Sequence, residues 1–167
     1  YSGRGTFTNL YISEGLKKGI PTIYITTQHT PNEVKDQLRN IIPKIDAYEE
    51  KGLIKFIDIY SRSMGITEEL PNTIYIEKST ELDAIQNALE RYQLEFKDKY
   101  PYHKIVFFSV STLLTYSEPL SIFRFFQVQE EHGQYQGNDH NYNRDDSCRA
   151  LLHNCNSITQ ALCPASP

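Results

Sequence analysis

The stretch "PTIYITTQHTPNEVKDQL", residues 21–38, decides the fold class of this chain. Its opening, residues 21–27, is rich in β-branched and aromatic side chains and is too short for a helix, so it predicts a strand. Thr30, Pro31 and Glu33 follow as the N-cap, the first-turn proline and the first-turn acid of a helix. A strand that passes through a short loop into a helix is the repeating unit of an α/β fold.

The same alternation continues on both sides of this unit. Apolar residues at helical spacing predict helices, and short runs of apolar residues predict strands. The apolar run at 105–110 is typical of a strand that is buried on both faces of a parallel sheet. The predicted helices cover 6–18 (ended by Gly19), 31–40, 79–97 and 120–129, with a short turn at 45–51, and the predicted strands cover 21–27, 53–59, 72–77 and 105–110.

The composition is that of an ordinary globular protein, with 167 residues, 39% hydrophobic and 23% charged. The net charge of −4 and the absence of a basic cluster argue against a nucleic-acid partner. No apolar run approaches the roughly 18 residues of a membrane span, so no membrane partner is expected. The three cysteines are too few and too clustered for a disulfide framework, which predicts a reduced, cytoplasmic setting.

The chain changes character near residue 132. Residues 1–131 carry the α/β pattern and are predicted to form one domain, whereas residues 132–167 keep no helical or strand period. We expect this tail to be poorly ordered, or to result from a shifted reading frame. Its potential zinc ligands have spacings that match no zinc knuckle, so no metal is expected there. They are His140, Cys148, His153, Cys155 and Cys163.

Three stretches together resemble the KaiC-like branch of the RecA-type P-loop ATPases. They are "TFTNLYISEGLKKGIPTIYITTQHTPNEVKDQL", "AYEEKGLIKFIDIYSRSMG" and "KIVFFSVSTLLTYSEPLSIFRFFQ", which stand in family order within residues 3–131. The resemblance implies a three-layer sandwich around a mostly parallel sheet. It also implies that a central strand precedes residue 1, and that the first half of the phosphate loop lies before residue 1 or is absent. The isolated chain is therefore expected to be truncated at its N-terminus and marginally stable.

The resemblance implies an ATP site at the start of the chain. Gly3 takes the place of the glycine before the family's phosphate-binding lysine, Arg4 takes the lysine's place, and Gly5 and Thr6 follow. Arg4 can pair with phosphate but is bulkier and forked. Gly5 has no hydroxyl for Mg²⁺, and Thr6 lies one residue late, so ATP is expected as ligand while Mg²⁺ is doubtful.

The resemblance also places the catalytic base after the strand at 21–27, where the family has two glutamates. This chain has Gln28 and His29. Gln28 can orient a water molecule but cannot act as a carboxylate base. His29 could accept a proton, although a histidine at a strand end is more often a solvated loop residue.

The family's Mg²⁺-holding aspartate corresponds to Phe108 here, and a phenyl ring cannot ligate a hard cation. Ser109, Ser111 and Thr112 follow and could hold water molecules instead. Arg62 follows another strand and is a candidate phosphate or subunit contact, although an exposed loop arginine is the simpler interpretation.

Three functions remain open at this stage. The first is an ATP-binding domain with impaired hydrolysis that regulates or signals by assembling with itself or with an active paralogue. The second is an active ATPase that uses Arg4, Thr6 and Gln28 with water-held Mg²⁺. The third is a structural partner that binds no nucleotide. Phosphate release distinguishes the second from the first, and the effect of ATP on the melting temperature distinguishes the third.

Overall fold

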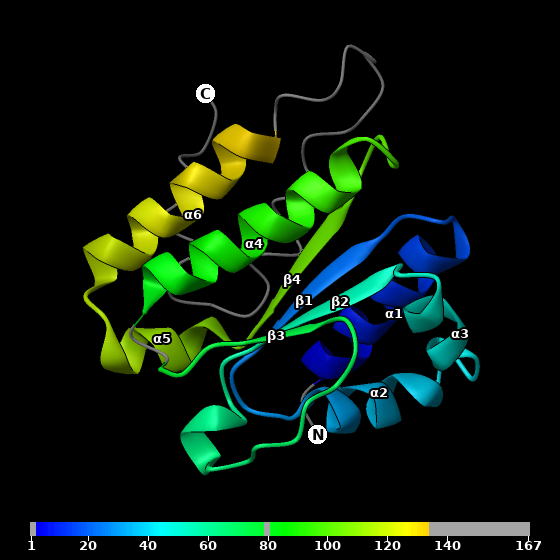
Figure 1. Ribbon diagram of the computed structural model, residues 1–167, viewed down its shortest axis with the longest axis horizontal. Coiled ribbons are helices and arrows are strands. Elements are labelled where there is room, and N and C mark those ends of the chain that lie inside the picture. The colour runs from blue at the N-terminus through cyan, green and yellow to red at the C-terminus, as the bar shows by residue number, and fades with distance from the viewer. Residues whose placement is uncertain (1–2, 79–80, 134–167) are drawn as a thin grey trace.

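A parallel sheet forms the centre of the computed structural model, which describes residues 3–78 and 81–133. The strands lie in the order β3-β2-β1-β4, and every adjacent pair is parallel (Figure 1). The predicted α/β class with a mostly parallel sheet is therefore confirmed. The strands are β1 (Thr22–Thr26), β2 (Ile54–Asp58), β3 (Thr73–Tyr75) and β4 (Lys104–Phe108).

Helices cover both faces of the sheet and give the three layers that the sequence predicts (Figure 1). Helices α1, α2 and α3 pack on one face, and α4, α5 and α6 pack on the other. A 3-10 turn, η1 (Arg62–Met64), follows β2. The helices are α1 (Gly3–Lys17), α2 (Pro31–Arg39), α3 (Ile45–Glu50), α4 (Leu82–Lys97), α5 (Val110–Tyr116) and α6 (Pro119–Gly133).

Alternating side chains of the strands fill two separate cores. Successive residues of a strand point to opposite faces, so each strand contributes to both layers. All five residues of β1 and of β2 are buried, as expected for strands inside a parallel sheet. Ile23, Ile25, Ile57 and Phe107 face α4–α6, whereas Tyr24, Ile54, Phe56 and Val106 face α1–α3.

The prediction for 105–110 is wrong in two respects. β4 ends at Phe108, and Val110 already begins α5, which the sequence analysis missed. In addition, β4 lies at the edge of the described sheet and is only partly buried. The strand stops because Ser109 acts as the N-cap of α5, and its hydroxyl accepts a hydrogen bond from the backbone N–H of Ser111 at 3.3 Å.

The ends of the first and last described helices differ from the predicted ones by a few residues. α1 begins at Gly3 rather than at residue 6, and Gly19, at φ +73°, ends it as predicted. α6 continues to Gly133, so the predicted boundary after residue 131 falls within its last turn. Residues 134–167, with all the potential zinc ligands, lie outside the described residues. Within the described part, none of the helices is long and apolar enough to cross a bilayer.

The start of α2 has the cap that the sequence predicts. The backbone N–H of Glu33 donates to the Thr30 hydroxyl at 3.2 Å, and the backbone N–H of Thr30 donates to the Glu33 carboxylate at 2.7 Å. This reciprocal pair is a capping box. The hydrogen bonds from Thr30 lower the pKa of Glu33. The carboxylate is therefore held as an anion at the helix N-terminus.

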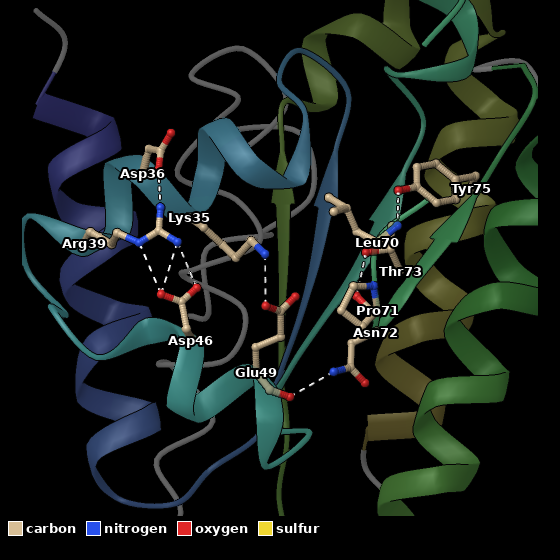
Figure 2. A network of polar contacts seen from close by, with 10 residues as sticks. All are labelled: Lys35, Asp36, Arg39, Asp46, Glu49, Leu70, Pro71, Asn72, Thr73 and Tyr75. Carbon is tan, nitrogen blue, oxygen red and sulfur yellow. Dashed lines mark hydrogen bonds and ion pairs between the residues drawn. The ribbon is translucent and has the colours of Figure 1, made fainter. Parts of the chain in front are cut away.

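A buried ion pair joins α2 to α3 (Figure 2). Nζ of Lys35 lies 2.9 Å from Oε2 of Glu49, and the two side chains are only 7% and 9% exposed. The backbone carbonyl of Glu49 accepts from the Asn72 amide at 2.8 Å, and the Asn72 oxygen accepts from Lys55 at 2.8 Å. The helical layer is thereby tied to the loop that leads into β3. Arg39, at the surface nearby, pairs with Asp36 and Asp46.

Gly15 marks a close approach between α1 and β4. Nζ of Lys104 donates to the backbone carbonyl of Tyr11 at 2.9 Å and lies 3.6 Å from the centre of the Tyr11 ring. A Cβ atom on Gly15 would come within 2.9 Å of Cδ and Cε of Lys104. The lysine can pass over the helix only because residue 15 has no side chain.

We expect Gly15→Ala to lower the free energy of unfolding by about 1 kcal/mol. The higher helix propensity of alanine contributes about 1 kcal/mol, but displacing Lys104 loses a charged hydrogen bond of about 1.5–3 kcal/mol. In a Lys104→Ala background the same substitution should instead stabilise the protein. Urea denaturation of the four variants of this cycle measures both effects. Destabilisation of equal size in both backgrounds would contradict the explanation.

Candidate functional site at the carboxyl edge of the sheet

The loops after β1 and β4 lie side by side at one edge of the sheet. In a parallel sheet all strands end at the same edge, which is where ligands bind in open α/β folds. Thr26 is the register partner of Phe108, and the backbone N–H of Thr27 donates to the Phe108 carbonyl at 2.9 Å. The predicted base and metal positions are therefore brought together.

A set of hydrogen bonds, here named the Thr27–Thr112 clasp, joins these two loops. Oγ1 of Thr27 accepts from the backbone N–H of Ser109 at 2.9 Å. The same oxygen lies 3.0 Å from the Ser109 carbonyl and 3.2 Å from Oγ1 of Thr112. Nε2 of Gln28 donates to Oγ1 of Thr112 at 3.3 Å. The predicted water-orienting residue Gln28 is thus attached to the first turn of α5.

An aromatic residue, Phe108, occupies the position where the resemblance predicts a metal ligand. The ring of Phe108 stacks against the imidazole of His29 at a centroid distance of 6.1 Å and an interplanar angle of 27°. The centre of the Phe108 ring also lies 6.5 Å from that of Tyr24. Tyr24 is buried, and the loss of solvation raises the pKa of its hydroxyl. His29 is therefore a partly buried partner of Phe108 rather than a freely solvated loop residue.

Glu33 and Asp58 are carboxylates near this edge that bond the surrounding backbone. Glu33 completes the capping box of α2. Asp58, the last residue of β2, is fully buried and accepts from the backbone N–H groups of Tyr60 and Ser61 at 2.8 and 2.9 Å and from the Ser61 hydroxyl. Asp58 uses both of its oxygens in its own loop, whereas Glu33 uses Oε2 for the capping box.

The roles of Asp58 and of the Thr27–Thr112 clasp were not predicted from the sequence. The Asp-x-x-Ser spacing of residues 58–61 is a local signal for a side chain that bonds its own turn, so Asp58 could have been found. No local signal marks the clasp, because Thr27 and Thr112 are 85 residues apart in the sequence.

Arg62 holds its own loop together. Its guanidinium donates to the carbonyl of Ile66 at 3.0 Å, lies 3.3 Å from Glu69, and stacks 4.4 Å from the centre of the Tyr75 ring. Its side chain is 15% exposed, less than expected for an exposed loop arginine. The backbone N–H of Leu70 also donates to the Tyr75 hydroxyl, which fixes the far end of the same loop.

The predicted phosphate-binding residues Gly3, Arg4, Gly5 and Thr6 form the first turn of α1. The second half of α1 lies beside Lys104, at the amino end of β4, and α1 leads into the amino end of β1. The helix therefore runs opposite to the strands, and its start lies toward the carboxyl edge (Figure 1). A helix N-terminus favours anions. The role of these four residues stays a prediction.

Replacing Thr27 with valine is expected to lower the free energy of unfolding by about 1–3 kcal/mol, because the backbone N–H of Ser109 loses its acceptor in a poorly solvated place. Thr27→Ser keeps the hydroxyl and should cost less. Thr115→Val provides a matched control, since the Thr115 hydroxyl bonds at an exposed position. Equal losses for Thr27→Val and Thr115→Val in urea denaturation would show that the clasp contributes nothing.

Comparisons with known proteins agree with this architecture. The model of the KaiC ATPase family matches residues 2–129. The UPF0273 protein PH0284 of Pyrococcus horikoshii is 28% identical over 68 residues, which cover 41% of this chain and 28% of that protein. The UPF0273 proteins PF1931 of Pyrococcus furiosus and MK0039 of Methanopyrus kandleri are each 26% identical over 68 residues, 41% of this chain and 28% and 27% of the relatives.

A solved structure shares the fold. The uncharacterized protein PH0321 from Pyrococcus horikoshii, crystallised with an unknown peptide, superposes with a TM-score of 0.60 at 18% identity and covers 77% of this chain and 54% of that one. The chain thus matches less than a third of the length of its curated relatives. Because the family model extends over most of the chain and the parallel sheet brings the family's motif positions to one edge, the chain belongs to the KaiC ATPase family.

Proposed function

We propose that this chain is a nucleotide-binding domain of the KaiC ATPase family in which ATP hydrolysis is impaired. The family supports nucleotide binding. The observation that carries the proposal is the Phe108–His29 stack, which stands where the resemblance places a metal-holding aspartate beside a catalytic glutamate. Neither Phe108 nor Gln28 supplies a carboxylate, and Glu33 and Asp58 are engaged elsewhere.

The chemistry expected at this edge is binding without efficient turnover. Gln28, held by Thr112, can orient a water molecule but cannot remove its proton. Arg4 and the backbone N–H groups at the start of α1 would face the phosphates. The ATP is expected to stay bound, because neither Gln28 nor His29 supplies the carboxylate that activates the attacking water in the family.

The first test compares binding with turnover. Millimolar ATP should raise the melting temperature of the chain, because a ligand that binds only the folded state stabilises it. Phosphate release should stay near that of a buffer blank. Arg4→Ala should abolish the thermal shift, whereas Arg124→Ala, which removes an exposed arginine of α6, should retain it. Rapid, Mg²⁺-dependent phosphate release that Arg4→Ala abolishes would favour the active ATPase. An unmoved melting temperature would favour the structural partner.

The regulatory part of the proposal concerns assembly. A nucleotide that binds one arrangement of subunits better than another shifts the population toward it without being hydrolysed. We propose that the chain, in a cytoplasmic setting, assembles in this way with copies of itself or with an active paralogue. Light scattering with and without ATP should then give different molar masses. The same mass under both conditions would contradict the regulatory role while leaving nucleotide binding intact.

A further inference from the structure

The carboxyl edge of the sheet does not fit the Mg²⁺ ion that the family implies. Mg²⁺ takes oxygen ligands in near-octahedral geometry and is bound in ATPases through one or two protein carboxylates or hydroxyls and the phosphates. At the end of β4 the side chain is Phe108, whose ring centre lies 6.1 Å from that of His29 and 6.5 Å from that of Tyr24. An ion placed there would meet carbon on the side where it needs oxygen.

Three of the neighbouring hydroxyls, those of Thr27, Ser109 and Thr112, already take part in hydrogen bonds. Oγ1 of Thr112 accepts from Gln28 at 3.3 Å and lies 3.2 Å from Oγ1 of Thr27, whose single proton it shares with the Ser109 carbonyl. The Thr27 oxygen accepts from the backbone N–H of Ser109, and the Ser109 hydroxyl accepts from that of Ser111. Ligation of a metal by Thr112 or Thr27 would break the clasp that joins β1 to α5. The water-held Mg²⁺ that these hydroxyls were expected to support is therefore disfavoured.

The nearby carboxylates Glu33 and Asp58 are poor substitutes. Glu33 accepts from the backbone N–H and the hydroxyl of Thr30, and Asp58 is fully buried and bonded to its own loop. Among all described residues, no group of three or more His, Cys, Asp or Glu side chains could hold a metal ion. The mismatch therefore involves the bonded hydroxyls of the clasp and the buried Asp58 as well as the substituted Phe108.

We propose that this site excludes divalent cations, and that nucleotide binds here as the metal-free polyphosphate. The proposal rests on the nucleotide binding proposed above. It differs from impaired hydrolysis, because a site without a base could still require Mg²⁺ to bind ATP. Because Phe108 stands where the resemblance places the metal-holding aspartate, removal of Mg²⁺ by a chelator should leave nucleotide binding unchanged.

Isothermal calorimetry on the wild-type chain tests the proposal, with ATP titrated once in excess Mg²⁺ and once in excess EDTA. We expect dissociation constants that agree within error, or tighter binding in EDTA. Binding weakened about tenfold or more by EDTA, a loss of about 1.4 kcal/mol, would overturn it. The absence of binding in both buffers would refute the proposed function instead.

A second measurement decides the metal question even if ATP does not bind. The electron paramagnetic resonance signal of free Mn²⁺ is recorded as wild-type chain is added without nucleotide. A signal that is unchanged, or that falls equally for wild type and Thr112→Val, supports exclusion from this edge. Stoichiometric Mn²⁺ binding by the wild type that Thr112→Val abolishes would overturn the proposal.

Phe108→Asp supplies the missing carboxylate, so nucleotide binding by this variant should become dependent on Mg²⁺. In this variant ATP should bind at least about tenfold more tightly with Mg²⁺ than with EDTA. Phe108→Leu, which also removes the aromatic ring but adds no oxygen, should stay independent of Mg²⁺. A folded Phe108→Asp variant with the same Mg²⁺ dependence as wild type would show that Phe108 is not what excludes the ion.

Discussion

Replacing Lys35 with methionine is expected to lower the free energy of unfolding by about 3–5 kcal/mol, the usual loss when one partner of a buried ion pair is removed. Lys35 and Glu49 are both more than nine-tenths buried, and Oε1 of Glu49 has no hydrogen-bond partner. Without the ammonium group, the carboxylate would remain as an uncompensated charge between α2 and α3. Urea denaturation of wild type and variant measures the loss.

The double variant Lys35→Met/Glu49→Leu should recover most of this stability, because replacing both charges with apolar groups of similar size removes the unpaired ion. Lys18→Met serves as the control, since Lys18 pairs with Glu14 at the surface and such pairs contribute little. A double variant that is less stable than Lys35→Met alone would mean that Glu49 matters through its other contacts rather than through the ion pair.

The second large effect is expected for Phe107→Ala. This substitution should lower the free energy of unfolding by about 3–5 kcal/mol, as truncation of other fully buried phenylalanines does. Its ring is 1% exposed and meets Phe125 and Phe126 edge-on at 6.3 and 5.8 Å. The alanine would leave a cavity between β4 and α6. Urea denaturation measures this loss, and the m-value should stay unchanged.

Phe108→Ala is the matched comparison, because Phe108 is the next residue of β4, points to the opposite face and is partly exposed. Its truncation should cost clearly less stability, since it buries less surface. If the two alanine variants were equally destabilised, Phe108 would belong to the structural core, and its role in excluding a cation would need another explanation.

Much of the fold follows from local signals in the sequence. The capping residues Thr30 and Glu33 predict the start of α2, and the β-branched runs predict β1 and β2, because these signals act within a few residues. The boundary between β4 and α5 was not predictable in this way. The apolar run continues through Phe108 into Val110, and only the cap made by Ser109 separates strand from helix.

The candidate site could be predicted only in part. The positions of Gln28, His29 and Phe108 came from a resemblance of ordered motifs, and the parallel sheet does bring all three together. What they contact could not be predicted, because each partner lies about eighty residues away in the sequence. The buried pair Lys35–Glu49 was not predicted either, because an amphipathic helix normally places its charges in solvent.

The parallel pairing of β1 with β4 also bears on how the chain folds. Only α2 and α3 lie between β1 and β2 in the chain. Between β1 and its other neighbour β4 lie also β2, β3 and α4. Closing long segments is slow, because their entropy is lost before the contacts form. We therefore expect the β1–β2 half to form early and the ligand edge to be completed last. A nascent or cleaved chain that ends before β4 would lack Phe108 and the Thr27–Thr112 clasp, so its ligand edge would be incomplete.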